Sequence, residues 1–127
     1  VIQQISDAEL EIMKIIWANE GPALFAGLME ELAAKGKTWQ KNTLITLLGR
    51  LMAKGYLKAK KSGRKNEYTA LISEAEYQTA QTRCFLDRIY EGSAKGLVSN
   101  LIQSELLTDG EYDELKKLLE GGRRGDE

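Results

Sequence analysis

Apolar residues recur at helical spacing in three segments of the first half of the chain. The first segment opens at Ser6, where Ser-Asp-Ala-Glu is a capping box, and ends before Pro22. The second runs from Phe25 to a stop at Gly36. The third covers residues 40–54 and places leucines at the i, i+3, i+4 and i+7 positions of a core-facing stripe. The pattern therefore predicts three helices, each with a buried side.

The period of the pattern changes to two after Gly55. Residues 57–61 and 68–72 alternate as strands do, and the Ser-Gly-Arg-Lys-Asn segment between them contains the glycine of a turn. These residues predict a β-hairpin with a cationic tip. Three helices followed by such a hairpin are the order of a winged helix-turn-helix. Its third helix enters the DNA major groove, while the hairpin, or wing, contacts the adjacent backbone or minor groove. The alternative is a small α+β domain whose basic hairpin merely faces solvent.

The second half of the chain predicts three more amphipathic helices. Capping boxes at residues 73–76 and 108–111 open the first and the last, and Gly92 ends the first. About 50 residues offer little material for a private core. The economical arrangement buries the apolar faces against a second copy of the chain, and the alternative is that they fold back on the first domain. The predicted dimer interface consists of Leu97, Val98, Leu101, Ile102, Leu115, Leu118 and Leu119.

The expected fold is mainly α with a small β-hairpin wing. We expect a winged helix-turn-helix DNA-binding domain over residues 1–72, a three-helix dimerisation domain over residues 73–120, and a disordered tail over residues 121–127. No apolar run approaches the ~18 residues that a membrane span needs, and no secretion signal is visible. With one cysteine and no such signal, the expected setting is the cytoplasm.

Charge is distributed unevenly along the chain. Residues 38–65 contain eight Lys and Arg residues and neither Asp nor Glu. Because the formal net charge of the whole chain is −1, the residues outside this segment together carry −9. A polyanion is the expected partner of such a segment, although a solvated basic face would have the same charge.

The side of the third helix that lies opposite its leucines favours DNA as that polyanion. It carries Asn42, Thr46, Gly49 and Ala53, with Thr43 and Arg50 at its flanks. An ordinary solvated helix face is rich in Glu and Lys, whereas this face is small, uncharged or cationic. Small side chains permit close approach, and hydroxyl, amide and guanidinium groups can bond to base edges or phosphates.

The residue types present argue against an enzyme. The chain has no histidine, which removes imidazole bases and histidine-containing metal sites. Its single cysteine, Cys84, is expected to be a buried small apolar side chain in the middle of a helix. No cofactor and no metal site are expected. The remaining alternative is a winged-helix interaction module that docks an acidic protein partner.

Four segments together resemble the penicillinase-repressor family (BlaI/MecI type), over nearly the whole chain from Ile5 to Leu119. They are the SDAELEIMKIIW opening, the run W-x-x-x-T-x-x-T-L-L-x-R-L-x-x-K-G-Y at residues 39–56, the basic wing that ends at Tyr68, and G-L-V-x-N at residues 96–100. The resemblance implies a homodimeric transcriptional repressor that binds a pseudo-palindromic operator in double-stranded DNA. It does not imply the copper-responsive branch of the family, because the C-terminal segment has no cysteine.

The predicted DNA contacts combine this resemblance with the charge and helix-face arguments. In and before the recognition helix they are Trp39, Lys41, Asn42, Thr43, Thr46 and Arg50. In the wing they are Lys60, Lys61, Arg64 and Lys65. The chain departs from the family at Ile45, where an arginine is common, so its operator sequence is expected to differ. Ile45 either touches a thymine methyl group or packs within the domain.

The resemblance also implies a route of induction. In signalling members of the family, a membrane metalloprotease sensor triggers cleavage of the repressor at an Asn–Phe bond. The matching bond here is Asn100–Leu101, where Asn100 fits the pattern and Leu101 does not. The primary role expected for Leu101 is in the dimer core.

Overall fold

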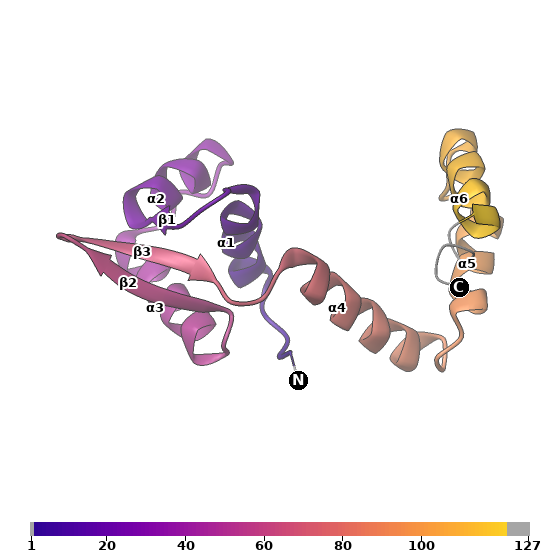
Figure 1. Ribbon diagram of the computed structural model, residues 1–127, viewed down its shortest axis with the longest axis horizontal. Coiled ribbons are helices and arrows are strands. Elements are labelled where there is room, and N and C mark those ends of the chain that lie inside the picture. Colours follow the sequence, from indigo (N-terminus) through magenta and orange to yellow (C-terminus); the bar gives the residue numbers. More distant parts are fainter. Residues whose placement is uncertain (1, 122–127) are drawn as a thin grey trace. The chain divides into compact units, whose positions relative to one another are not determined.

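The computed structural model describes residues 2–121, which form six helices and a three-stranded antiparallel sheet (Figure 1). This confirms the predicted fold class. The chain divides into two compact units, of which the first is Val1–Gln81 and the second begins at Thr82. In chain order the elements are α1 (Asp7–Ala18), β1 (Ala23–Leu24), α2 (Phe25–Ala34), α3 (Lys41–Ala53), β2 (Leu57–Ser62), β3 (Lys65–Ala70), α4 (Glu74–Ile89), α5 (Ala94–Gln103) and α6 (Asp109–Gly121).

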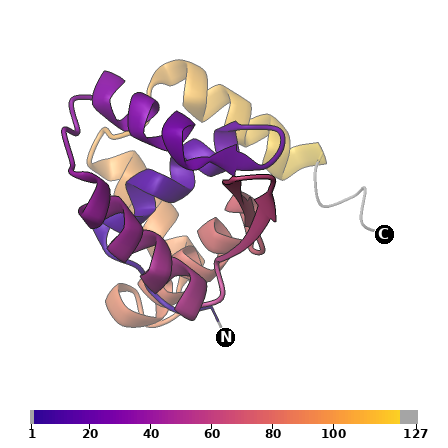
Figure 2. The ribbon, with the colours of Figure 1, turned by 90° about the vertical axis from the view of Figure 1, so that its left-hand side faces the viewer.

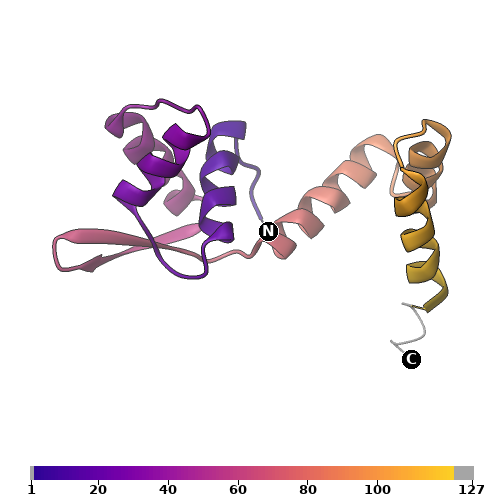
Figure 3. The same ribbon diagram turned by 90° about the horizontal axis from the view of Figure 1, so that it is seen from above.

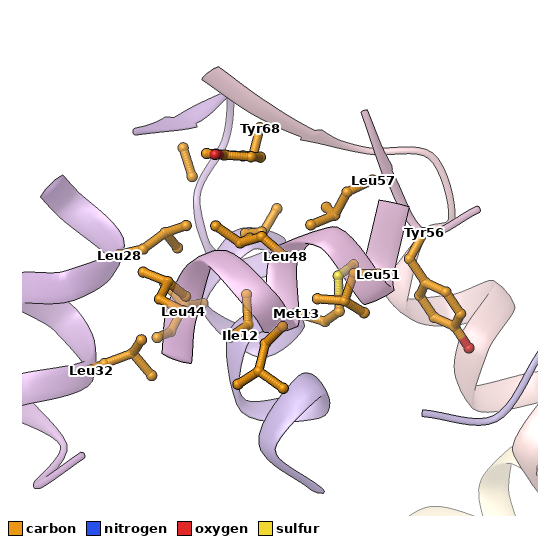
Figure 4. Close-up of a cluster of buried hydrophobic side chains, with 14 residues drawn as sticks. Ile12, Met13, Leu28, Leu32, Leu44, Leu48, Leu51, Tyr56, Leu57 and Tyr68 are labelled. Atoms are coloured by element: carbon orange, nitrogen blue, oxygen red, sulfur yellow. The ribbon is translucent and has the colours of Figure 1, made fainter. Parts of the chain in front are cut away.

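The core of the first unit is built on one side of α3, and the three helices cross one another around it (Figure 2). The predicted leucine stripe is confirmed, because its four side chains are at most 7% exposed. They meet apolar residues of α1, α2 and the hairpin (Figure 4). Each fully buried leucine contributes roughly 1.5–3 kcal/mol. The buried residues of α3 and its main partners are Leu44, Leu47, Leu48, Leu51, Ile12, Met13, Leu28, Leu32, Tyr56, Leu57 and Tyr68.

The sheet has the strand order β1-β3-β2, and its first strand was not predicted. β1 is only two residues long, which is too short to show a period of two, and it pairs with Tyr68 and Glu67 of β3. β2 and β3 pair as predicted, but Ser62 lies opposite Lys65, so the turn is two residues long rather than the predicted five. Gly63 has a φ of 66° at the first turn position, where a type II′ turn takes glycine. The hairpin tip projects beyond the helices of this unit (Figure 3).

Gly55 ends α3 and directs the chain into the core. Its φ is 83°, and the following Tyr56 amide donates a hydrogen bond of 2.9 Å to the carbonyl of Leu51. The Tyr56 ring is then fully buried, and its hydroxyl donates to the carbonyl of Gln3. Burial raises the pKa of Tyr56 to about 12, and the nearby Tyr77 and Glu9 add to the shift. The hydroxyl therefore stays protonated, and keeps this hydrogen bond, to a higher pH than an ordinary tyrosine would.

Glu9 is a buried acid that ties the start of α1 to the end of α3. Its Oε1 accepts from the Ser6 amide at 2.8 Å, while the Glu9 amide donates to Ser6 Oγ at 3.2 Å, which confirms the predicted capping box. The same Oε1 lies 2.9 Å from Nζ of Lys54, the residue that follows α3. Burial by itself raises the pKa of Glu9, but the hydrogen bonds from Ser6 and Lys54 outweigh it and hold that pKa below 4.5.

An aromatic cluster attaches the first turns of α4 to the first unit. The indole Nε1 of Trp17 donates to the carbonyl of Ile72 at 2.8 Å. The ring of Tyr77, in α4, lies 5.5 Å from that of Trp17 and 6.0 Å from that of Tyr56. The first compact unit therefore extends to Gln81, within α4, whereas the sequence placed the junction at the helix cap. The cap itself is confirmed by reciprocal hydrogen bonds between residues 73 and 76.

No residue of α4, α5 or α6 is buried in the single chain. The predicted capping box of α6 is confirmed, with hydrogen bonds between Thr108 and Glu111 in both directions. Cys84 is exposed, so its expected burial was wrong. The reason is that these helices find no core of their own in one chain. The predicted tail lies outside the described residues, apart from Gly121 at the end of α6. Within residues 2–121, no helix has the length and apolarity that crossing a membrane requires.

The Glu9–Lys54 ion pair leads to a prediction about stability. Glu9→Gln keeps an oxygen for the Ser6 amide but places a neutral amide against Lys54, so the free energy of unfolding should fall by about 1–3 kcal/mol. Glu76→Gln is the matched control, because Glu76 closes an identical but exposed capping box. Its effect should be much smaller. Chemical denaturation measures both, and equal losses would show that the cap rather than the ion pair carries the effect.

The depressed pKa of Glu9 adds a dependence on pH. A carboxyl whose pKa is lower in the folded protein stabilises the fold above its unfolded pKa, and this contribution is lost as the pH falls through the folded pKa. The wild type should therefore exceed Glu9→Gln in stability by a constant amount near neutral pH, and the difference should shrink below pH 4.5. Denaturation of both proteins across that range measures it. A difference that stays constant into acid would contradict the assignment.

Candidate nucleic-acid interface

The side of α3 that faces away from the core is exposed along its whole length. Five of the predicted contact residues lie on this side, at its flanks or at the start of the helix, and all of them are exposed. A Cβ at Gly49, also on this side, would meet no atom within 4 Å. This side is therefore open at Gly49, so the wall of a DNA groove can approach the helix closely there. The five residues are Lys41, Asn42, Thr43, Thr46 and Arg50.

The cations of this region are almost all available to a ligand. Within residues 2–121 the one ion pair joins Lys54 to Glu9, so seven of the eight cations in residues 38–65 have no acidic partner. The predicted wing residues Lys60, Lys61, Arg64 and Lys65 are all exposed. Lys60 lies opposite Glu67 in the sheet register, which partly compensates its charge. The cations without an acidic partner thus gather in the wing and at Lys41 and Arg50 of α3, where they create a positive field.

The start of α3 adds to this field. Gln40 caps the helix without a side-chain hydrogen bond, and the first turn contains no acid but begins with Lys41. Free amides and the positive end of the helix dipole favour an anion at this point. Trp39 differs from the other predicted contacts, because it is half-buried and packs against the core. Trp39 thus anchors the segment that leads into α3 to the core.

One part of the surface was missed by the sequence. A cavity of about 280 Å³ lies between the start of α2 and the hairpin tip. It exists because β1 pairs with β3 and so brings the start of α2 beside the wing. A two-residue strand leaves no pattern in the sequence that would have revealed it. The lining residues are Leu24, Phe25, Ala26, Arg64, Lys65 and Asn66.

Ile45 and Met52 are exposed apolar residues on α3. The sequence left open whether Ile45 packs within the domain or faces a ligand. The structure excludes packing in the core, because the side chain of Ile45 is 56% exposed and lies outside the core cluster. Met52, two turns further along, is also exposed.

The predicted dimer residues of the second unit are exposed or half-exposed in the single chain. Leu118 and Leu119 are the most open of them, at 64% and 70%. Asn100 lies within α5, where its side-chain amide donates to the Tyr90 hydroxyl at 2.8 Å and its Oδ1 accepts from Ser104 Oγ at 2.9 Å. In the part of the chain that the structure describes, no group of three or more His, Cys, Asp or Glu residues could hold a metal ion.

Known proteins resemble the chain over nearly its whole length. The family model described as Penicillinase repressor matches residues 5–121. The penicillinase repressor of Bacillus licheniformis is 39% identical over 119 residues, which cover 94% of this chain and 91% of that protein. The methicillin resistance regulatory protein MecI of Staphylococcus aureus (strain N315) is 33% identical over 116 residues, which cover 91% of this chain and 93% of that protein.

Solved structures match the first unit. The DNA-binding domain of the repressor BlaI is 44% identical with a TM-score of 0.53, covering 61% of this chain and 92% of that one. The monomeric form of Bacillus licheniformis BlaI in complex with the blaP half-operator is 44% identical with a TM-score of 0.51, over the same shares. Since the family model and the full-length relatives both match more than nine-tenths of the chain, the chain belongs to the penicillinase repressor family.

Proposed function

We propose that this chain is a DNA-binding transcriptional repressor that acts as a homodimer on a pseudo-palindromic operator. The observation that carries the proposal is the open, acid-free side of α3 together with the wing. Seven cations of this segment have no acidic partner within residues 2–121. The relatives support it, because they are named as repressors and one structure contains a half-operator. Because the chain belongs to a family of repressors, we assign no enzymatic function to this surface.

The two parts of the surface have different tasks in this proposal. In α3, Thr43, Thr46 and Arg50 combine hydroxyl and guanidinium groups on exposed positions, and these groups can discriminate base edges. In the wing, lysine and arginine side chains reach phosphates, which supply affinity but carry no sequence information. In this proposal the cavity between α2 and the hairpin tip adds to the surface that the DNA backbone can contact. The interface is thus a short reading helix beside a larger electrostatic clamp.

In this proposal the second unit holds two copies of the chain together. Its helices bury no side chain in one chain, yet they carry a set of large exposed apolar residues. Exposed apolar surface of this extent is typical of an interface, and a two-fold arrangement lets one such surface cover its own copy. The residues are Phe85, Ile89, Val98, Ile102, Leu106, Tyr112, Leu115, Leu118 and Leu119.

Relief of repression by proteolysis at Asn100–Leu101, at the end of a membrane metalloprotease sensor pathway, is part of the same proposal. The bond lies inside α5, and the hydrogen bonds of Asn100 to Tyr90 and Ser104 hold that turn closed. A protease binds its substrate in an extended form, so α5 must open locally before cleavage. In the single chain the side chains around the bond are exposed or half-exposed, so opening α5 there costs less free energy than opening the core of the first unit.

The proposed function predicts specific, salt-sensitive binding to DNA. Genomic fragments selected by the full chain should share two half-sites about one helical turn, or about 10 bp, apart or a multiple of it. Affinity should fall about 10³–10⁵-fold between 50 and 200 mM salt if six to ten phosphates are contacted. Fluorescence anisotropy across a salt series measures both selected and unrelated duplexes. Equal affinity for the two would contradict sequence-specific binding.

Reading and clamping residues should respond differently to substitution. Arg50→Ala should weaken operator binding by about 1–3 kcal/mol and relax the preference at one base pair if the guanidinium bonds to a base edge. The pair Arg64→Gln and Lys65→Gln should weaken all duplexes alike and lower the salt slope by about one per lost phosphate contact. Lys117→Gln, an exposed cation of α6, is the control and should change neither. If Arg50→Ala weakens all duplexes alike, Arg50 contacts phosphate.

The dimer is tested by sedimentation of the full chain. The wild type should sediment as a dimer at micromolar concentration, while the double substitution Ile102→Glu and Leu118→Glu should give monomers, because it places charge in the apolar interface. Leu71→Glu is the matched control, since the exposure of Leu71 lies between those of Ile102 and Leu118 but the residue belongs to the first unit. It should leave the dimer intact. A monomeric wild type would favour helices that fold back on the first unit.

A further inference from the structure

Ile45 is a large apolar side chain on the outer side of α3, and packing within the first unit does not account for it. The side chain is 56% exposed and lies outside the core cluster that the leucines of α3 form. A β-branched residue also has a lower helix propensity than the alternatives at an exposed position. Single exposed apolar residues are common on protein surfaces, so the inference depends on where on the helix Ile45 lies.

Ile45 flanks the open side of α3, on the edge opposite to Thr43 and Arg50. At 3.6 residues per turn, it stands between the buried leucine stripe and the open side that carries Asn42 and Thr46. Gly49 is one turn further along, and it presents no side chain on the same flank. A groove wall can therefore approach Ile45 closely. When α3 lies in the major groove, the Ile45 side chain is at the edge of the reading surface.

The chemistry of the groove limits what Ile45 can contact there. Base pairs present hydrogen-bond donors and acceptors in the major groove, together with one apolar group, the C5-methyl of thymine. A hydrocarbon side chain cannot replace the hydrogen bonds that polar base edges or phosphates lose when they leave water. Contact with a thymine methyl, in contrast, buries apolar surface on both partners. The complementary group for Ile45 is the methyl.

We propose that Ile45 contacts the C5-methyl of a thymine and thereby specifies thymine at one position of each half-site. This inference rests on the proposed function and adds a specificity-determining residue to it. The contact is apolar, so it contributes to discrimination between sequences and adds nothing to the salt dependence. It would also give this chain an operator preference at that position that a hydrogen-bonding side chain would not give.

The test removes the methyl group from the DNA and the apolar side chain from the protein in one double-mutant cycle. The selected operator is remade with deoxyuridine in place of each thymine in turn, which deletes only the C5-methyl. With the wild-type full chain, deoxyuridine at one symmetric pair of positions should weaken binding about fourfold per half-site, the worth of one buried methyl. With Ile45→Ala, the same replacement should leave Kd unchanged.

Two further variants serve as controls. Ile45→Val keeps a branched apolar tip and should retain most of the sensitivity to deoxyuridine. Met52→Ala removes another exposed apolar side chain of α3 and should retain all of it at the same thymines. Since both positions lie outside the core cluster, the variants should unfold at the wild-type temperature.

Two results would overturn the inference and leave the proposed function intact. One is a wild type that binds its operator specifically but is insensitive to deoxyuridine at every position. The other is an Ile45→Ala variant that keeps the full sensitivity of the wild type. A selection that recovers no preferred sequence at all would instead overturn the proposed function, and the inference with it.

Discussion

The one-sided burial of α3 is the constraint on which the rest of the first unit depends. Four leucines hold the helix against α1 and α2, and their burial leaves the opposite side of the same helix wholly exposed. Gly55 then turns the chain so that Tyr56 enters the core and the hairpin starts beside α3. Apolar packing therefore places the outer side of α3 and the wing, and the polar groups on these surfaces are not needed to hold the fold together.

Electrostatics divides the charged residues of this unit into two groups. Lys54, at the end of α3, is held by the buried carboxylate of Glu9 and serves the fold. The other cations of residues 38–65 have no acidic partner within the described residues and remain available to an external anion. Concentrating them has a cost in self-repulsion, which the extended hairpin limits by keeping its cations in solvent. Binding to phosphate offsets the remaining repulsion.

Local signals in the sequence were sufficient for much of this structure. The leucine period located the buried side of α3, and the Ser-x-x-Glu and Thr-x-x-Glu spacings located three helix starts. What the sequence missed depends on contacts between distant residues. The Glu9–Lys54 pair joins positions 45 residues apart, and β1 is defined only by its partner β3. The exposure of Cys84 was missed because a helical pattern shows which side is apolar, and does not show whether anything covers it.

We infer that α3 and the wing of the first unit form the DNA-binding surface. The most direct test is to titrate the isotope-labelled full chain with the selected operator duplex and to monitor the backbone amide shifts in its NMR spectrum. The largest shift changes should fall within residues 38–65, on the outer side of α3 and at the hairpin tip. Changes centred on α1, on the α1–β1 loop or on α6, with α3 and the hairpin unaffected, would contradict it.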